Sequence, residues 1–352
     1  MIVKKILFLL IIIFCLNTYA SSRAVVVMDT ESKRVLYSEN MNEEKLIAST
    51  TKIMTFVVAY EYAQDFLDVK VEAGDEILKM YGTSIYLSLH EKMTLRDLLY
   101  GLMLRSGNDA AVVIANFVGG SIDGFVKLMN KKAQFLGMNN TKFYNPHGLD
   151  EETKNISTAY DMALLSSYAT RIPLYNKVTS TKYYKVQTEN KAYSWTNRNK
   201  FLFMYPLFIN GKTGYTPTAG RCLVTTAKNN NLQLTVVSLN DYNHYENQRL
   251  LYDEMFKKYQ KTLIISKNFF NVESDNLYIK QDIYYPLKES EKEKINIKLL
   301  LNDVEKAKKG ELIVELDGKM IVKEDVYGKI RNDDYHSKSF LEKIKELLKK
   351  IL

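Results

Sequence analysis

The sequence predicts an α+β protein: an antiparallel sheet with helices on its faces, followed by a small all-β domain. Three observations lead to this prediction. Strand-like segments come first, helical segments fill the middle, and strands with one more helix close the first part of the chain. An antiparallel sheet whose first and last strands are neighbours accommodates that order. Beyond residue 262, apolar and polar residues alternate with the period of two that is typical of strands.

The first elements follow from local patterns. Two short strands are predicted at 24–29 and 34–38, on either side of the polar turn Thr30-Glu31-Ser32-Lys33. Apolar spacing predicts helices at 49–63, 94–104, 109–118 and 121–136. Ser121 is a suitable N-cap for the last of these helices and Gly137 a suitable stop. Thr158 and Asp161 resemble a capping pair that opens a further helix.

The closing elements have a different character. The β-rich runs 221–227 and 232–239 predict a hairpin around Lys228-Asn229-Asn230-Asn231, and 245–259 predicts a helix. A separate small β domain is assigned to residues 262–335, where 295–299 and 312–316 alternate and Asp317-Gly318 supplies a turn.

Composition excludes one class of function. The chain has 352 residues, of which 46% are hydrophobic, so it can bury a core, and its formal charge is +8. That charge is spread along the sequence, and the 25 tyrosines are scattered. Nucleic-acid binding needs basic clusters interleaved with stacking aromatic residues, so no nucleic-acid partner is expected.

Residues 1–20 have the pattern of a signal peptide. Lys4 and Lys5 form a basic start, 6–16 is apolar, and Thr18-Tyr19-Ala20 offers a cleavage site. The apolar run is shorter than the roughly 20 residues that span a bilayer, although an uncleaved anchor is an alternative. We therefore expect export and a folded domain over residues 21–261. Cleavage would leave Cys222 as the one cysteine, expected to be a buried and inert thiol.

The last segment, 336–352, is predicted to be an amphipathic helix. Its apolar residues fall within an arc of about 140° on a helical projection; they are Phe340, Leu341, Ile344, Leu347, Leu348, Ile351 and Leu352. Lysines and glutamates occupy the other side. Such a helix favours an anionic membrane surface, which suggests a peripheral protein on the outer face of the cytoplasmic membrane. The alternative is a helix that packs on its own domain.

Ser49-Thr50-Thr51-Lys52 is the sharpest local motif. Residues i and i+3 share a helix face, so the Ser49 hydroxyl and the Lys52 amine can meet. A serine hydroxyl becomes a nucleophile when a neighbouring base takes its proton. Lysine can be that base where burial or another cation lowers its pKa, and the apolar residues that follow Lys52 predict such burial.

Two further motifs follow in order. Ser106-Gly107-Asn108 lies between two predicted helices, where a turn can aim side chains into a cleft. Lys212-Thr213-Gly214 offers a cation and a hydroxyl on a strand, with a glycine that leaves backbone access to a ligand. A phosphate-binding loop is excluded for this motif, because Pro206 stands where that loop needs glycine.

Taken together, the three motifs resemble the active-site set of penicillin-binding proteins and class A β-lactamases. The segments 47–55, 104–111, 145–150 and 212–216 are similar to one branch, the low-molecular-mass penicillin-binding D-Ala-D-Ala carboxypeptidases. The resemblance covers about residues 24–259. It continues more faintly at 309–312 and 316–319, which look like that family's C-terminal β domain.

The resemblance implies a β-lactamase/transpeptidase-like catalytic domain and an acyl-enzyme mechanism without metal or cofactor. It assigns Ser49 as the nucleophile, Lys52 as its proton acceptor and Ser106 as a proton relay. It also implies binding groups for the substrate: the Asn108 amide, the Lys212 and Thr213 side chains, the bare backbone of Gly214, and the backbone N–H groups of Ser49 and Tyr215 as an oxyanion hole. The implied partners are peptidoglycan stem peptides ending in D-Ala-D-Ala, and β-lactams as inhibitors.

Some residues depart from this pattern or suggest alternatives. Relatives often place an arginine near Asn243, and this chain has none there. His147 is interpreted as a structural hydrogen-bonding residue rather than a base. Glu151, four residues before Asn155, leaves a β-lactamase as one alternative function. A catalytically silent wall-binding protein is another, although such a protein would be expected to lose Ser49 or Lys52.

Overall fold

A computed structural model describes residues 23–267, 277–301 and 308–328. The chain divides into two compact units between Glu254 and Met255, and each unit is described here by itself. The predicted signal peptide at 1–20 and the predicted amphipathic helix at 336–352 lie outside the described residues.

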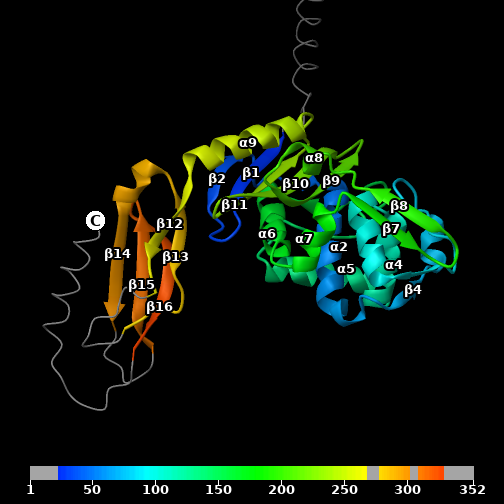
Figure 1. The fold of residues 1–352 in the computed structure, drawn as a ribbon, viewed down its shortest axis with the longest axis horizontal. Helices are drawn as coiled ribbons and strands as arrows, with labels where there is room; N and C mark the ends of the chain where they lie inside the picture. The colour runs from blue at the N-terminus through cyan, green and yellow to red at the C-terminus, as the bar shows by residue number, and fades with distance from the viewer. Residues whose placement is uncertain (1–22, 268–276, 302–307, 329–352) are drawn as a thin grey trace, which may run out of the picture. The chain divides into compact units, whose positions relative to one another are not determined.

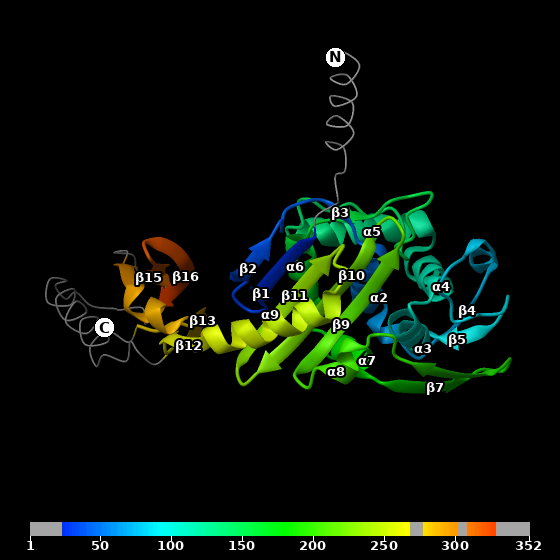
Figure 2. The ribbon, with the colours of Figure 1, turned by 90° about the horizontal axis from the view of Figure 1, so that it is seen from above.

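The first unit is built on a five-stranded antiparallel sheet with the strand order β2-β1-β11-β10-β9. Its strands are β1 (Ala24–Asp29), β2 (Val35–Glu39), β9 (Phe208–Thr216), β10 (Gly220–Asn229) and β11 (Leu232–Leu239). The first strand of the sheet pairs with the last, with Ala24 opposite Leu239, as the order of elements predicted. The strand β9, which carries the third motif, is therefore an edge strand (Figures 1 and 2).

Helices cover both faces of this sheet (Figure 1). On one face, α6 (Ala159–Ala169) packs on β1 and β11, and α7 (Pro173–Ser180) packs on β9. On the other face lies α9 (His244–Lys258), where Gln248 donates to the Leu223 carbonyl and Tyr252 donates to the Thr225 carbonyl. Both layers are needed because each face of the sheet is rich in apolar or β-branched residues.

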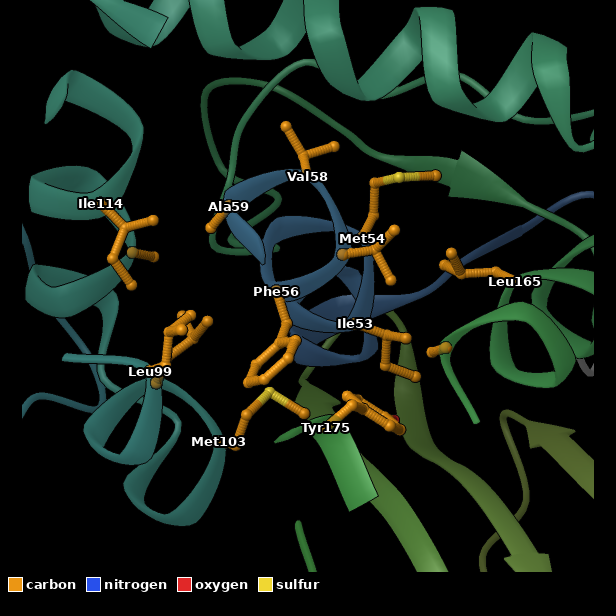
Figure 3. Close-up of a cluster of buried hydrophobic side chains, with 14 of the residues drawn as sticks. Ile53, Met54, Phe56, Val58, Ala59, Leu99, Met103, Ile114, Leu165 and Tyr175 are labelled. Atoms are coloured by element: carbon orange, nitrogen blue, oxygen red, sulfur yellow. The ribbon is translucent and has the colours of Figure 1, made fainter. Parts of the chain in front are cut away.

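The helix α2 (Lys52–Ala63) lies in the middle of the helical layer. It is apolar around most of its circumference, which is the pattern of a helix enclosed on all sides. Figure 3 shows the side chains of this helix, such as Ile53 and Phe56, among those of the surrounding helices. The Phe56 and Tyr175 rings meet edge to face, with their centroids 5.3 Å apart. The start of α2 is thereby fixed in the core.

The predicted helix at 94–104 has an interruption. It is regular only in α3 (Leu95–Tyr100), and then widens into a π-helical turn, η4 (Gly101–Arg105). A side chain on Gly101 would lie 2.9 Å from Ile85 and 3.2 Å from Trp195, so this turn is closely packed. Such turns are frequent at functional sites, and this one ends at the second motif.

The other predicted helices are present. They are α4 (Asn108–Gly119), α5 (Ile122–Phe135) and α6. Ser121 accepts a hydrogen bond from the Gly124 N–H at 3.0 Å, and Thr158 accepts one from the Asp161 N–H at 3.1 Å, as their capping roles predicted. Gly137 has φ +72°, which suits its role as a stop.

The prediction missed several short elements of the first unit. They are η2 (Gln64–Phe66), η3 (Asp75–Lys79), α7, α8 (Phe201–Met204), and the two-stranded ladders β3 (Lys45–Leu46) with β6 (Ile156–Ser157), β4 (Lys70–Glu72) with β5 (Lys92–Thr94), and β7 (Tyr183–Gln187) with β8 (Ala192–Thr196). The predicted helix at 49–63 begins with a 3₁₀ turn, η1 (Ala48–Thr51), before the regular α2.

The second unit consists of strands around its own core, as expected for the small β domain. Its elements are β12 (Gln260–Ile265), β13 (Ile283–Leu287), η5 (Glu289–Lys294), β14 (Ile295–Leu301), β15 (Lys308–Leu316) and β16 (Lys319–Tyr327). The predicted turn at Asp317-Gly318 joins β15 to β16, and both residues have positive φ, +53° and +76°. Leu312, Val314 and Val326 are fully buried between the sheets β12-β13 and β14-β15-β16.

Within the described residues, no single helix combines the length and apolar character needed to cross a membrane. One bent pair, Asn108–Gly119 with Ile122–Phe135, meets the length and composition criteria, with an angle of 84° between its helices.

Candidate active site

Ser49 and Lys52 meet at the start of α2. Ser49 is in the 3₁₀ turn η1, directly before the first residue of the helix, and Lys52 follows three positions later. Lys52 Nζ lies 3.0 Å from Ser49 Oγ, within hydrogen-bond distance. Ser49 is partly exposed whereas Lys52 is fully buried, so the hydroxyl can meet a ligand while the amine stays behind it.

The Lys52 amine is in an environment that disfavours its charge. Burial, and then the positive charge of Lys212, hold the pKa of Lys52 well below its usual value, although the carboxylate of Asp109 acts in the opposite direction. Lys52 also lies 2.8 Å from Asn108 Oδ1 and 2.5 Å from the His147 carbonyl oxygen. A lysine with a lowered pKa beside a serine hydroxyl is a general base next to a nucleophile.

The second motif turns sharply after the π-helical turn. Ser106 has φ +62°, in the left-handed region, and its hydroxyl makes no hydrogen bond within the described part of the chain. Asn108 starts α4 and is buried, and while its Oδ1 faces Lys52, its Nδ2 donates to the Tyr81 carbonyl at 2.7 Å. The turn therefore brings Asn108 into contact with Lys52, and Ser106 lies two residues before Asn108.

Asp109, which the sequence did not single out, holds the neighbouring loop. Its carboxylate accepts from the Ser84 hydroxyl at 2.5 Å and from the Ile85 and Leu87 N–H groups at 3.0 Å each. Because Asp109 is the second residue of α4, its charge also suits the positive end of that helix. The loop that carries the Tyr81 carbonyl is thus tied to the same helix as the motif.

The third motif lies on the edge strand β9. Lys212 is buried and donates to the Thr213 carbonyl at 2.7 Å. Burial, and then the charge of Arg198, lower the pKa of Lys212 to about 7. Tyr215 is exposed, and Thr213 is partly exposed.

Gly214 brings β9 against the nucleophile. A side chain at this position would lie 3.0 Å from the backbone nitrogens of both Ser49 and Thr50. Only the absence of a side chain lets the strand approach the Ser49 N–H so closely. The backbone N–H of Ser49 therefore lies close against β9 at Gly214.

A loop that the sequence indicated only by resemblance completes the site. The 145–148 turn lies over the start of α2, and its His147 carbonyl contacts Lys52. Gly148 has φ +88°, and a side chain there would lie 2.0 Å from the Ala48 carbonyl oxygen. Gly148 is therefore the residue in the sequence that could have indicated this close approach of the loop to the backbone of Ala48.

The His147 side chain is not placed to act as a base. Its Nδ1 accepts from the Leu149 N–H at 3.1 Å, and burial followed by the Lys52 charge lowers its pKa to about 3. The ring is therefore neutral and structural, in line with its interpretation from the sequence. Glu151, the base of the β-lactamase alternative, is exposed to solvent. Cys222 is fully buried, and burial raises the pKa of its thiol to about 12, as expected of an inert thiol.

Two arginines near the third motif were also missed. Arg198 follows β8, and its N–H donates to the Leu104 carbonyl at 3.0 Å, beside the turn that carries Ser106. Arg221 lies on β10 directly opposite Tyr215, and its guanidinium is 4.6 Å from the centre of the Tyr242 ring. No local pattern marks either residue, because strand pairing and tertiary packing bring each of them to the site.

Comparison with known proteins gives a consistent result. The family described as D-alanyl-D-alanine carboxypeptidase, Peptidase_S11, matches residues 17–243. The chain is 37% identical over 220 residues to the D-alanyl-D-alanine carboxypeptidase DacF of Bacillus subtilis, covering 61% of this chain and 56% of that protein. It is 31% identical over 229 residues to a D-alanyl-D-alanine endopeptidase of Escherichia coli, covering 64% of this chain and 73% of the relative.

Solved structures include similar folds. Penicillin binding protein 5 from Haemophilus influenzae matches with a TM-score of 0.74 and 27% identity, covering 87% of this chain and 95% of that one. The match to curated sequences is less complete, since the chain spans a little over half the length, 56%, of the Bacillus subtilis relative.

Proposed function

The chain belongs to the D-alanyl-D-alanine carboxypeptidase family, Peptidase_S11, and on this premise we propose that it hydrolyses the terminal D-Ala-D-Ala bond of peptidoglycan stem peptides. One observation carries the proposal beyond family membership. Lys52 Nζ, buried and with a lowered pKa, lies 3.0 Å from the Ser49 hydroxyl. This pair can generate an alkoxide-like nucleophile at neutral pH.

This geometry supports an acylation step. Ser49 Oγ attacks the carbonyl carbon between the two D-alanines while its proton passes to Lys52. The tetrahedral oxyanion is stabilised by the N–H groups of Ser49 and Tyr215, at about 3 kcal/mol per donor. The C–N bond then breaks, and the departing D-alanine amine takes a proton through Ser106. Water hydrolyses the resulting ester and releases the shortened peptide. A β-lactam amide would follow the first steps and leave a stable acyl-enzyme.

The terminal carboxylate of the substrate is the group that Lys212 and Thr213 would bind. Lys212 is buried and experiences the positive charge of Arg198, so an anion at this position would favour the charged form of Lys212. Thr213 supplies a hydroxyl donor on the same strand. Asn108 would hold the amide of the substrate, and the bare backbone of Gly214 would let the peptide lie against β9.

Arg221 is expected to assist at the carboxylate in place of the arginine missing near Asn243. Because it pairs with Tyr215 and Leu223 pairs with Thr213, Arg221 and Thr213 share one face of the sheet as diagonal neighbours. Diagonal neighbours are about 7–8 Å apart, which is within reach of an arginine. Arg221→Ala should raise KM for the peptide about tenfold with little effect on kcat. An unchanged KM would place the carboxylate contact elsewhere.

The site of action proposed is the outer face of the cytoplasmic membrane. The basic and apolar pattern of residues 1–20 supports export, and the amphipathic pattern of Phe340–Leu352 supports peripheral attachment. A substrate that lies outside the cytoplasm agrees with both patterns.

The deciding experiment is direct. The purified protein is incubated with a peptide that ends in D-Ala-D-Ala, and released D-alanine is measured, with the same peptide ending in L-Ala-L-Ala as control. Release from the first peptide alone is expected. Efficient hydrolysis of penicillin without release of D-alanine would instead support the β-lactamase alternative. Inertness to both would support a silent wall-binding protein.

A further inference from the structure

The Lys52 amine has three hydrogen-bond partners that differ in kind. Asn108 Oδ1 lies at 2.8 Å and the His147 carbonyl oxygen at 2.5 Å, and neither atom can donate a hydrogen. The orientation of the Asn108 amide is fixed, because its Nδ2 donates to the Tyr81 carbonyl. Ser49 Oγ, at 3.0 Å, is the one partner that carries a hydrogen of its own.

This arrangement determines where the lone pair of a neutral Lys52 points. A neutral amine has two hydrogens and one lone pair. The two pure acceptors take both hydrogens, so the lone pair is left for the Ser49 O–H, which is the orientation needed to remove its proton. The protonated amine has three hydrogens and would donate to all three partners. The His147 carbonyl therefore both orients the base and stabilises its protonated form.

The position of that carbonyl depends on the 145–148 turn. Within this turn, Asn145 Oδ1 accepts from the His147 and Gly148 N–H groups at 3.2 and 2.6 Å. Thr55, on α2, donates to the Pro146 carbonyl at 2.5 Å. The Lys52 contact is the one that the structure gives for the carbonyl of His147 itself.

Asn155 joins this turn to the start of α2. Its Oδ1 accepts from the Tyr144 and Asn145 N–H groups at 2.7 and 3.1 Å. Its Nδ2 donates to the Asn145 carbonyl at 2.9 Å and to the Thr51 hydroxyl at 3.0 Å. Asn155 is buried, and Thr51 directly precedes Lys52 in the chain. A single amide thus spans the turn and the residue next to the base.

We infer that Asn155 is a positioning residue for the Ser49–Lys52 pair, acting through the His147 carbonyl. The catalytic role of Asn155 rests on the proposed function. The coupling between Asn155 and the protonation of Lys52 does not, because it can be measured without turnover.

The test compares Asn155→Leu with a matched control, Asn130→Leu. Leucine is close to asparagine in size and keeps water out, but it removes every bond of the amide. Asn130 also anchors this loop, at Phe143, accepting from its N–H at 2.9 Å and donating to its carbonyl at 2.8 Å. It makes no contact with the 145–148 turn among the described hydrogen bonds. A purely structural loss should therefore affect both variants alike.

Two measurements are made on each variant. The first is an NMR titration of isotope-labelled lysine, with the Lys52 signal assigned by its loss in Lys52→Arg. Loss of an acceptor that stabilises the ammonium should lower the pKa of Lys52 in Asn155→Leu by about one unit relative to Asn130→Leu. The second is the rate constant of acylation by penicillin as a function of pH. Its plateau should fall about 10- to 100-fold, and its acid limb should move to lower pH.

If Asn155→Leu does not fold, Thr51→Val provides a milder change, because it removes only the link between Thr51 and Asn155. In Thr51→Val, the pKa of Lys52 and the plateau of the acylation rate constant should fall as in Asn155→Leu, but by less. A pKa of Lys52 that is equal in the Asn155 and Asn130 variants overturns the inference. A wild-type protein inert to both peptide and penicillin would overturn the proposed function, while the titration would still decide the coupling.

Discussion

Lys52 shows how a lysine can serve as a base near neutral pH. The side chain is fully buried, and the positive charge that lowers its pKa further belongs to another buried lysine, Lys212. Burial and the neighbouring charge both disfavour the charged form of Lys52, so its amine can be neutral without another side chain to take its proton. Lys212 has the opposite requirement, since it must be charged to bind a carboxylate. The site therefore places two lysines with different tasks in one electrostatic environment.

Replacing the nucleophile should separate chemistry from folding. Ser49→Ala removes one partly exposed oxygen, so the unfolding midpoint should stay within a few degrees of the wild type. Covalent labelling by a fluorescent penicillin, read on a denaturing gel, should be lost completely. Labelling that persists in this variant would assign the acylated residue elsewhere.

The pH dependence of kcat/KM should be bell-shaped. The rate rises with pH as Lys52 loses its proton, through a pKa well below the usual value for lysine. It falls as Lys212, with a pKa lowered to about 7, loses the charge that binds the carboxylate. Because the two lysines interact, each limb reports on the pair.

Lys212→Arg identifies the alkaline limb. Arginine stays protonated, so this limb should move up by roughly two pH units or more, while the acid limb remains or moves to lower pH. An alkaline limb that stays in place in Lys212→Arg would belong to another group.

At the scale of elements, the β7–β8 hairpin is held by a buried carboxylate. Glu91 is fully buried, and it accepts from Thr188 at 2.6 Å, from Tyr193 at 2.8 Å and from the Ser88 N–H at 2.9 Å. The hairpin is also attached through Tyr184, whose ring stacks on that of Tyr100 with centroids 3.7 Å apart. The hairpin ends at Thr196, two residues before Arg198, so its attachment helps to fix the position of Arg198.

Glu91→Ala should therefore lower the free energy of unfolding by about 2–4 kcal/mol, because it leaves the buried Tyr193 hydroxyl and two partly buried donors without their acceptor. Glu189→Ala is the matched control. Glu189 lies on the same hairpin, and its exposed carboxylate pairs with Lys70 at 2.9 Å, so its loss should change the free energy of unfolding far less than the loss of Glu91. Urea denaturation measures both. Equal losses would show that the buried network does not hold the hairpin.

At the scale of the whole molecule, the sequence predicts attachment to a membrane. The C-terminal segment Phe340–Leu352 lies outside the described residues, and its predicted role rests on its amphipathic pattern and on five lysines against two glutamates within 338–352. Each basic residue near an anionic surface contributes about 1 kcal/mol, and salt weakens this attraction.

Deleting Phe340–Leu352 should release the mature protein from vesicles of anionic lipid without reducing hydrolysis of a soluble peptide. Co-sedimentation at low and high salt measures the release. A truncated protein that unfolds would show that the helix is core packing. One that stays bound after its leader is cleaved would place the anchor elsewhere.

The sequence by itself determined the order of elements, the neighbouring first and last strands of the sheet, and the three motifs. These features are local, since caps, apolar periodicity and an i to i+3 pair can be recognised within a few residues. Even so, the π-helical turn before Ser106 and the exposed β7–β8 hairpin were missed. The π-helical turn goes with the close packing of Gly101 against Ile85 and Trp195, which are distant in the sequence. The strands of the hairpin are short and partly polar, so their pattern is a weak signal for strands.

Only the tertiary structure decided what surrounds Lys52. The His147 carbonyl is a backbone group, which every residue type carries, so no residue pattern marks it as a partner of Lys52. Lys212, Asn155 and Arg221 come from distant segments, and their effects depend on distances that loops and strand pairing set. The sequence could name the nucleophile and its base, but the lowered pKa and the direction of the lone pair arise from burial and contacts formed only when the chain folds.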